Sequence, residues 1–75
     1  MRKPRQYTVI CLDNEGYEVS LERHKVYAAI DDQDAEKQGL VRIVDESGED
    51  YLYPSKSFTQ IDLPPNVQRA VLRAA

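Results

Sequence analysis

Residues 39–63, GLVRIVDESGEDYLYPSKSFTQIDL, carry the pattern that decides the fold. Residues 40–45, LVRIVD, predict a strand in which Val41 and Ile43, two residues apart, face the same way. Residues 45–50, DESGED, predict a hairpin turn, because Gly48 can supply the left-handed residue that a short hairpin needs. The first half of the stretch therefore predicts a strand that turns back on itself.

The second half of the stretch predicts the returning strand and its continuation. Residues 51–54, YLYP, are rich in aromatic and apolar side chains, and the strand should end at Pro54 because proline cannot donate to a ladder. Residues 55–57 predict a single 3₁₀ turn, and residues 58–63 predict a short last strand. Three short antiparallel strands are thus expected between residues 39 and 63.

The chain upstream of this stretch predicts the rest of a sheet. Residues 7–12, YTVICL, are β-branched and aromatic and predict a strand. Residues 13–16, DNEG, predict a turn in which the aspartate caps its own backbone and glycine takes positive φ. Residues 17–21 predict a second extended segment, because Val19 and Leu21 are two residues apart and so share one face of a strand.

A further strand and two helical segments complete the expected elements. Residues 25–30, KVYAAI, predict a strand after a turn in which His24 tolerates positive φ. Residues 31–38, DDQDAEKQ, predict an acidic loop with one helical turn. Residues 66–74 predict a helix that has to pack on the barrel, pack on a second subunit or fray, since a helix this short is marginal alone. Its apolar stripe is Val67, Val71 and Ala74.

Several short strands joined by tight turns in a small chain predict an all-β fold. The expected architecture is a closed or nearly closed barrel of five to six short antiparallel strands with a short C-terminal helix. We expect a basic flexible arm at residues 1–6, the barrel at residues 7–63, and a helix or tail at residues 64–75. The predicted core residues are Ile10, Val19, Leu21, Ala29, Val41, Ile43, Tyr53, Phe58 and Ile61.

The charge of the chain is unevenly distributed. Its 75 residues form one small domain with a formal net charge of −3. Residues 6–62 hold thirteen acidic and five basic side chains, a net charge of −8, while both ends are basic. An acidic body repels phosphate and anionic lipid, so we expect no membrane partner, and a nucleic acid is a disfavoured one.

Cys11 is the only cysteine, so no internal disulfide can form, which suits a reducing compartment. Its apolar neighbours predict a buried, unreactive thiol. The apolar run at residues 7–12 is too short for a signal peptide or a membrane span. We therefore expect a cytoplasmic protein.

Four short motifs occur in the order found in a known family. Residues 18–24, EVSLERH, look like E/D-L-S-F-K-K-G, and residues 39–43, GLVRI, lie where G-W-W-K-A does. Ser47–Gly48 falls at the distal hairpin, and residues 52–55, LYPS, look like Y-I-P-S. The chain thus resembles an SH3 domain over residues 9–61, and it is similar to small bacterial proteins of this barrel type. The resemblance implies an SH3-like barrel.

Only some residues of the peptide groove of SH3 domains have counterparts in this chain. Pro54 keeps the groove proline, and Glu18 lies where the family binds a ligand arginine. The family's aromatic groove positions fall at Leu12, Asn14, Leu40, Leu52 and Ser57. Proline-rich peptides dock on aromatic ridges, so ordinary proline-rich binding is not expected. The resemblance instead implies an apolar patch flanked by Tyr17 and carboxylates, made of Leu12, Leu40, Leu52 and Pro54.

Two acidic loops are the second feature that bears on function. One holds Asp13, Glu15 and Glu18, and the other holds Asp31, Asp32, Asp34 and Glu36. In an SH3-like barrel the two loops flank one face, where they would attract a basic peptide. The alternative is a solvated surface that keeps a small domain soluble.

The leading prediction is a non-enzymatic module that binds a protein or a basic peptide. The predicted contact residues are Leu12, Asp13, Tyr17, Glu18, Leu40, Leu52 and Pro54. We expect no enzyme, cofactor or metal site, because no nucleophile–base pair and no ligand cluster can be named. The first alternative is a homo-oligomer built through the C-terminal helix or a barrel edge.

RNA binding is the less favoured alternative. Tyr51 and Tyr53 share one strand face and could stack on single-stranded nucleic acid. Their neighbours Glu49 and Asp50 repel phosphate, however, so packing within the sheet or core is the preferred interpretation of the two tyrosines.

Overall fold

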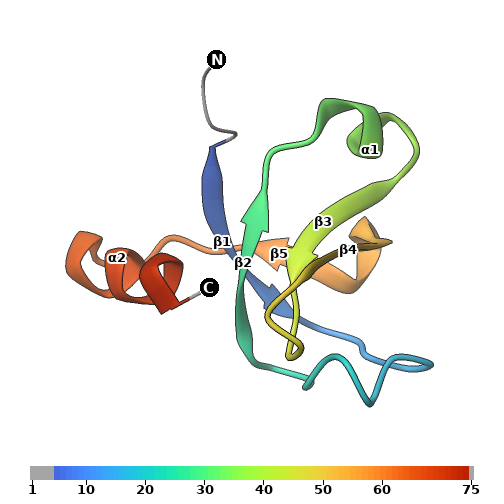
Figure 1. The fold of residues 1–75 in the computed structure, drawn as a ribbon, viewed down its shortest axis with the longest axis horizontal. Helices are drawn as coiled ribbons and strands as arrows, with labels where there is room; N and C mark the ends of the chain where they lie inside the picture. Colours follow the sequence, from blue (N-terminus) through green and yellow to red (C-terminus); the bar gives the residue numbers. More distant parts are fainter. Residues whose placement is uncertain (1–4, 75) are drawn as a thin grey trace.

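The computed structural model describes residues 5–74, and residues 1–4 of the predicted arm lie outside the described range. One five-stranded antiparallel sheet dominates the structure, with the strand order β4-β3-β2-β1-β5 (Figure 1). The strands are β1 (Gln6–Cys11), β2 (Val26–Ile30), β3 (Leu40–Val44), β4 (Asp50–Pro54) and β5 (Phe58–Gln60). The helical elements are α1 (Gln33–Lys37), the 3₁₀ turn η1 (Ser55–Ser57) and α2 (Pro65–Ala74). The predicted small, mainly-β fold with a C-terminal helix is confirmed.

The β3–β4 hairpin forms where residues 39–54 predict it. Val41 pairs with Tyr53, so both side chains point to the core face of the sheet. At the turn, the Asp45 N–H donates to the Glu49 carbonyl at 3.1 Å. Gly48 adopts a φ of +84°, the left-handed conformation that glycine takes without steric cost. The turn chemistry read from the sequence therefore sets the register of the hairpin.

Six of the nine predicted core residues are buried. They are Leu21, Ala29, Val41, Ile43, Tyr53 and Phe58, and the core also takes in Val9, Cys11 and Tyr27. Ile10 is only partly buried, because the inward positions of β1 are those of Val9 and Cys11. Ile61 is partly buried because it lies just past the end of β5. Both residues were wrongly placed in the core.

The loop that joins β1 to β2 differs most from the prediction. This segment, residues 12–25, is called the β1–β2 loop below, and it contains no strand. The Tyr17 carbonyl accepts hydrogen bonds from the N–H groups of Ser20 at 2.9 Å and Leu21 at 2.8 Å, which closes a helical turn. Residues two apart in such a turn point to different sides. Leu21 is therefore 1% exposed while Val19 is 97% exposed, so the predicted extended segment and the core assignment of Val19 are wrong.

His24 ends the β1–β2 loop in the left-handed conformation, with a φ of +69°. Its N–H donates to the Cys11 carbonyl at 2.6 Å, which joins the two ends of the loop. The turn role predicted for His24 is therefore confirmed.

Replacing His24 with glycine is expected to raise the free energy of unfolding by about 0.5–1 kcal/mol. The left-handed conformation costs an L-residue about 1–2 kcal/mol, and the greater flexibility of glycine in the unfolded chain offsets part of the gain. Urea denaturation measures the change. Arg23→Gly is the matched control, because Arg23 has no positive φ and should lose stability. Equal changes in the two variants would show that the backbone at His24 is not strained.

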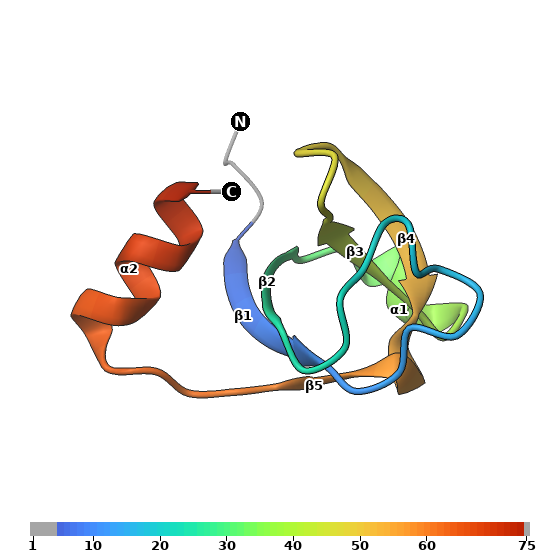
Figure 2. The same ribbon diagram turned by 90° about the horizontal axis from the view of Figure 1, so that it is seen from below.

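Helix α2 lies on the opposite side of the molecule from α1, η1 and the β1–β2 loop (Figure 2). It packs against β1 and β2. Its half-buried side chains are Gln68, Val71 and Leu72, whereas Val67 is 41% exposed. The predicted stripe is therefore only partly right, because the packed face turns away from Val67. None of the helices within residues 5–74 has the length and apolar character needed to cross a membrane.

Candidate functional site

A groove of about 360 Å³ runs between the β1–β2 loop and β4. The loop is tied to the β3–β4 hairpin by a hydrogen bond from the Glu46 N–H to the Ser20 carbonyl at 3.1 Å. Four of the lining residues belong to the loop or hairpin turn and three to β4. We call it the tyrosine groove, and its lining residues are Tyr17, Ser20, Asp45, Ser47, Tyr51, Leu52 and Tyr53.

Packed aromatic rings support the floor of the tyrosine groove. The Tyr17 ring meets the Tyr53 ring edge-on, with 5.1 Å between centroids and 87° between planes. The Tyr53 ring packs in turn against Phe58, with centroids 6.2 Å apart. Such edge-to-face pairs are favourable beyond the area that they bury. Tyr17 is therefore held in a fixed position while 39% of its surface stays exposed.

A buried carboxylate, that of Asp45, also lines the groove. The Tyr53 hydroxyl donates to Asp45 Oδ2 at 2.6 Å, and Ser47 donates to Asp45 Oδ1 through its N–H at 2.9 Å and its hydroxyl at 2.5 Å. Burial acts to raise the pKa of Asp45, but the hydrogen bonds from Ser47 and Tyr53 outweigh it and lower the pKa. No ion pair joins Asp45 to a cation within residues 5–74. The groove therefore contains a negative charge near neutral pH.

The same contact shifts the titration of Tyr53. Burial and the hydrogen bond to the Asp45 carboxylate raise the pKa of Tyr53 to about 12, because both disfavour a second negative charge at this position. The phenol thus stays protonated and serves as a fixed donor.

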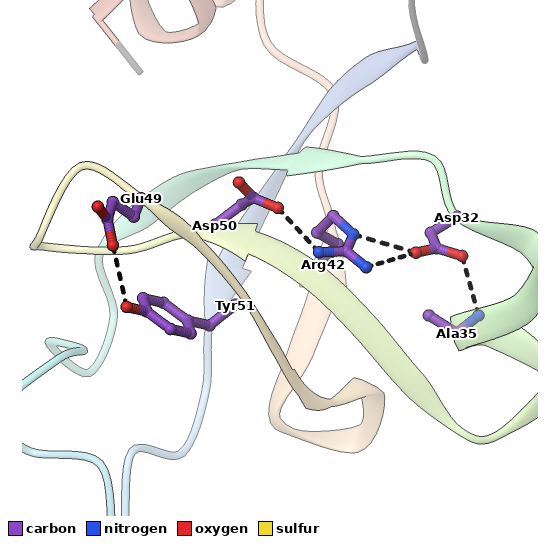
Figure 3. Close-up of polar contacts among 6 residues, drawn as sticks. All are labelled: Asp32, Ala35, Arg42, Glu49, Asp50 and Tyr51. Carbon is purple, nitrogen blue, oxygen red and sulfur yellow. Dashed lines mark hydrogen bonds and ion pairs between the residues drawn. The ribbon is translucent and has the colours of Figure 1, made fainter.

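The rim of the groove on β4 is aromatic and acidic. Tyr51 and Leu52 are 51% and 43% exposed. The Tyr51 hydroxyl donates to Glu49 Oε2 at 3.0 Å, and this hydrogen bond to the carboxylate raises the pKa of Tyr51 (Figure 3). The contact keeps a carboxylate beside the exposed ring, an arrangement that suits a cationic side chain.

The other face of the β3–β4 hairpin carries an ion-pair network that the sequence analysis missed. Arg42 donates to Asp32 Oδ2 through Nε at 3.0 Å and Nη2 at 2.9 Å, and to Asp50 Oδ2 through Nη1 at 2.8 Å (Figure 3). Asp32 also caps α1 by accepting the Ala35 N–H at 3.1 Å. The Ala35 N–H and the Arg42 guanidinium lower the pKa of Asp32. The carboxylates of Asp32, before α1, and Asp50, on β4, are thus already paired.

Three members of the predicted apolar patch share this outer face. Leu40 lies directly opposite Pro54 in the ladder. Leu52 lies opposite Arg42, two residues further along the strands, and is therefore on the same face as Leu40 and Pro54. Leu12 is placed differently, because its N–H donates to the Ser57 carbonyl of η1 at 2.8 Å. Leu12 is nevertheless exposed beside the turn that directly follows Pro54.

The acidic residues predicted to steer a partner have different local roles. Asp13 accepts the Glu15 N–H at 3.0 Å, and Glu18 accepts the Gly16 N–H at 3.2 Å, so both carboxylates shape the β1–β2 loop. On the other loop, Asp31 forms an exposed ion pair with Arg5 at 3.7 Å, while Asp34 and Glu36 are exposed.

The two acidic loops do lie on one side of the molecule. The β1–β2 loop and α1 flank η1 on the side away from α2 (Figures 1 and 2). Of the predicted contact residues, Tyr17 and Leu52 line the tyrosine groove, whereas Leu40 and Pro54 do not. Tyr51, for which the sequence predicts sheet or core packing, lies opposite Ile43 in the ladder and lines the groove.

No group of three potential metal ligands occurs among residues 5–74. Cys11 is fully buried, and burial raises the pKa of its thiol, which makes it a poor nucleophile. Comparisons with protein-family models, with curated proteins and with solved structures found no match to the chain. The fold and the tyrosine groove are therefore the observations from which a function can be argued.

Proposed function

We propose that the chain is a non-enzymatic protein-binding module that takes a basic peptide in the tyrosine groove. The observation that carries the proposal is where the exposed large hydrophobic side chains gather. Within residues 5–74 six such side chains are exposed, and five of them lie on the β1–β2 loop and β4. They are Leu12, Tyr17, Val19, Tyr51 and Leu52, and the sixth is Val67 on α2. Exposed apolar side chains that gather on two segments bordering one groove are typical of an interaction site.

We also propose that the sheet is an SH3-like barrel. The long β1–β2 loop and the 3₁₀ turn before β5 support this assignment, because they lie where the first and last of the four motifs that resemble SH3 domains occur, at residues 18–24 and 52–55. The tyrosine groove lies at a different position from the aromatic ridge of SH3 domains, and this chain lacks the aromatic residues that form that ridge.

The charge around the groove favours a basic partner. Glu15, Glu18 and Glu49 form no ion pair with a cation among the described residues, and buried Asp45 adds a further negative charge. Charges of one sign at a cleft raise the association rate of an oppositely charged ligand. The exposed rings of Tyr17 and Tyr51 can in addition stack on a guanidinium. An arginine-containing peptide thus matches both the charge and the ring surface.

Fluorescence anisotropy with two labelled peptides tests this proposal. Acetyl-Arg-Val-Arg-Val-Arg-Val-amide is expected to bind, with an affinity that falls as salt is added, whereas the Glu–Val counterpart should not bind. Tyr51→Ala should weaken the binding by roughly tenfold or more, as expected for an aromatic contact residue. Val67→Ala is the matched control, because Val67 is similarly exposed but lies on α2. Equal binding of the two peptides, or no effect of Tyr51→Ala, would refute the proposed site.

The two predicted alternatives have less support. A homo-oligomer built on the helix stripe needs Val71 free, but Val71 is half-buried on the helix that packs against β1 and β2. A nucleic acid would bring phosphates close to Glu49 and the other unpaired carboxylates. We therefore propose neither of these functions.

A further inference from the structure

We infer that the partner's peptide docks as an additional β-strand on the free edge of β4, held by main-chain hydrogen bonds, with its arginine side chains in the tyrosine groove. This inference rests on the proposed function and adds the binding mode and the sequence pattern of the ligand. It makes the backbone of β4, and not only its side chains, the recognition element.

The position and register of β4 identify the free edge. β4 is one of the two edge strands of the sheet, with β5 at the other edge, and it pairs only with β3. Two hydrogen bonds flank this ladder, from the Asp45 N–H to the Glu49 carbonyl at 3.1 Å and from the Ser55 N–H to the Gly39 carbonyl at 2.9 Å. In an antiparallel pair the hydrogen-bonded positions alternate. The positions of Tyr51 and Tyr53 therefore bond to β3.

The remaining positions of β4 present their backbone groups outward. Asp50 and Leu52 direct both N–H and C=O away from β3, and within residues 5–74 no other segment forms a backbone hydrogen bond to either of them. Leu52 is 43% exposed, so water or a partner can reach this edge. Pro54 has no N–H and ends the edge. An unpaired edge of this kind is a template for a further strand.

The two faces of β4 define which side chains a docked strand should carry. Side chains opposite Tyr51 and Tyr53 would lie on the groove side, beside the Tyr17 and Tyr51 rings and the Glu49 carboxylate. The side chain opposite Leu52 would lie on the outer face, next to Leu52 itself. The edge therefore fits an extended segment in which basic and apolar residues alternate, since successive strand residues point to opposite faces.

A second copy of this chain is a poorer occupant of the edge. Residues 6–62 carry a net charge of −8, so two bodies that approach through their acidic sides repel each other. A basic segment removes this repulsion and gains attraction from the unpaired carboxylates. The charge of the body thus favours a different, basic partner.

N-methylated peptides separate strand addition from other binding modes. A docked strand offers only every second N–H to β4, so we compare two forms of acetyl-Arg-Val-Arg-Val-Arg-Val-amide, one methylated on the arginine nitrogens and the other on the valine nitrogens. One form is expected to lose roughly tenfold or more in affinity while the other keeps it, because one set of methyl groups would lie between the strands. If both forms bind like the unmodified peptide, strand addition is wrong while the proposed groove stands. If the unmodified peptide does not bind, both proposals fail.

A pair of variants tests the same edge from the side of the protein. Leu52→Pro removes an outward N–H that the β3 ladder does not use, whereas Leu52→Ala keeps this N–H and only shortens the side chain. We expect Leu52→Pro to bind the unmodified peptide roughly tenfold more weakly than Leu52→Ala. Circular dichroism checks that both variants fold, and equal affinities of two folded variants would overturn the inference. Sedimentation equilibrium adds a further outcome, because a wild-type dimer that Leu52→Pro dissociates would show that a second copy occupies the edge.

Discussion

Replacing Leu21 with alanine is expected to lower the free energy of unfolding by about 2–5 kcal/mol. Leu21 is 1% exposed and is the only residue of the β1–β2 loop in the described core cluster. Truncating it leaves a cavity at the point where the loop is anchored, and the loop carries Tyr17 of the tyrosine groove. For a small domain this loss is a large part of the total stability. Urea denaturation monitored by circular dichroism measures it.

Val19→Ala is the matched control for this experiment. Val19 lies two residues from Leu21 on the same loop but is 97% exposed, so its truncation should change the unfolding free energy by less than about 0.5 kcal/mol. A strand at residues 17–21 would instead bury both side chains and make both substitutions costly. Similar losses in the two variants would therefore contradict the helical turn closed by the Tyr17 carbonyl.

The second large effect is a loss of stability at alkaline pH that depends on Tyr53. The folded protein raises the pKa of Tyr53 from 10.0 to about 12, so the folded state holds this proton more tightly than the unfolded state. The resulting stabilisation is fully present below pH 10 and is lost as the pH rises through 12. A shift of this size corresponds to roughly 2–3 kcal/mol. Urea denaturation at a series of pH values measures the decline.

Tyr53→Phe isolates the contribution of this one phenol. At neutral pH the variant should be less stable by roughly 1–3 kcal/mol, because Asp45 loses a hydrogen bond to its carboxylate. Other groups that titrate at high pH contribute alike to both proteins. The two stability curves are therefore expected to converge between pH 10 and pH 12. Curves that stay parallel over this range would show that Tyr53 does not titrate with a raised pKa.

Much of the fold could be predicted because its signals are local. Gly48 and His24 adopt the left-handed conformations that their turns require, and the 3₁₀ turn follows Pro54 as expected. The strands at residues 7–12, 25–30 and 40–45 lie within one residue of β1, β2 and β3 at each end. These features depend on side-chain patterns and backbone preferences over a few residues.

The β1–β2 loop could not be predicted in the same way. Val19 and Leu21 have the spacing of a strand face, and the same spacing also occurs in an irregular turn. The outcome depends on contacts distant in sequence, namely the fit of Leu21 into the core and the hydrogen bond from Glu46 to the Ser20 carbonyl. The pattern of apolar residues over five positions carries no information about either contact.

The candidate site shows the same division. The acidic character of the body, the apolar nature of Leu52 and the buried cysteine could all be recognised from the sequence, because composition and neighbours determine them. The sequence did not reveal which carboxylates lack an ion pair, because Arg42 pairs with Asp32, ten positions earlier in the chain, and with Asp50 across the hairpin.

By itself the sequence determined the places of the five strands, the turns at His24 and Gly48, the hairpin and the acidic body of this protein. Only the tertiary structure decided that Tyr17 packs on Tyr53, that Tyr51 borders a groove, and that β4 keeps a free edge. The physical reason is that turn preferences and charge act between neighbours in the chain. A groove and a sheet edge exist only after strands distant in sequence have paired and paid the entropy of closing the loops between them.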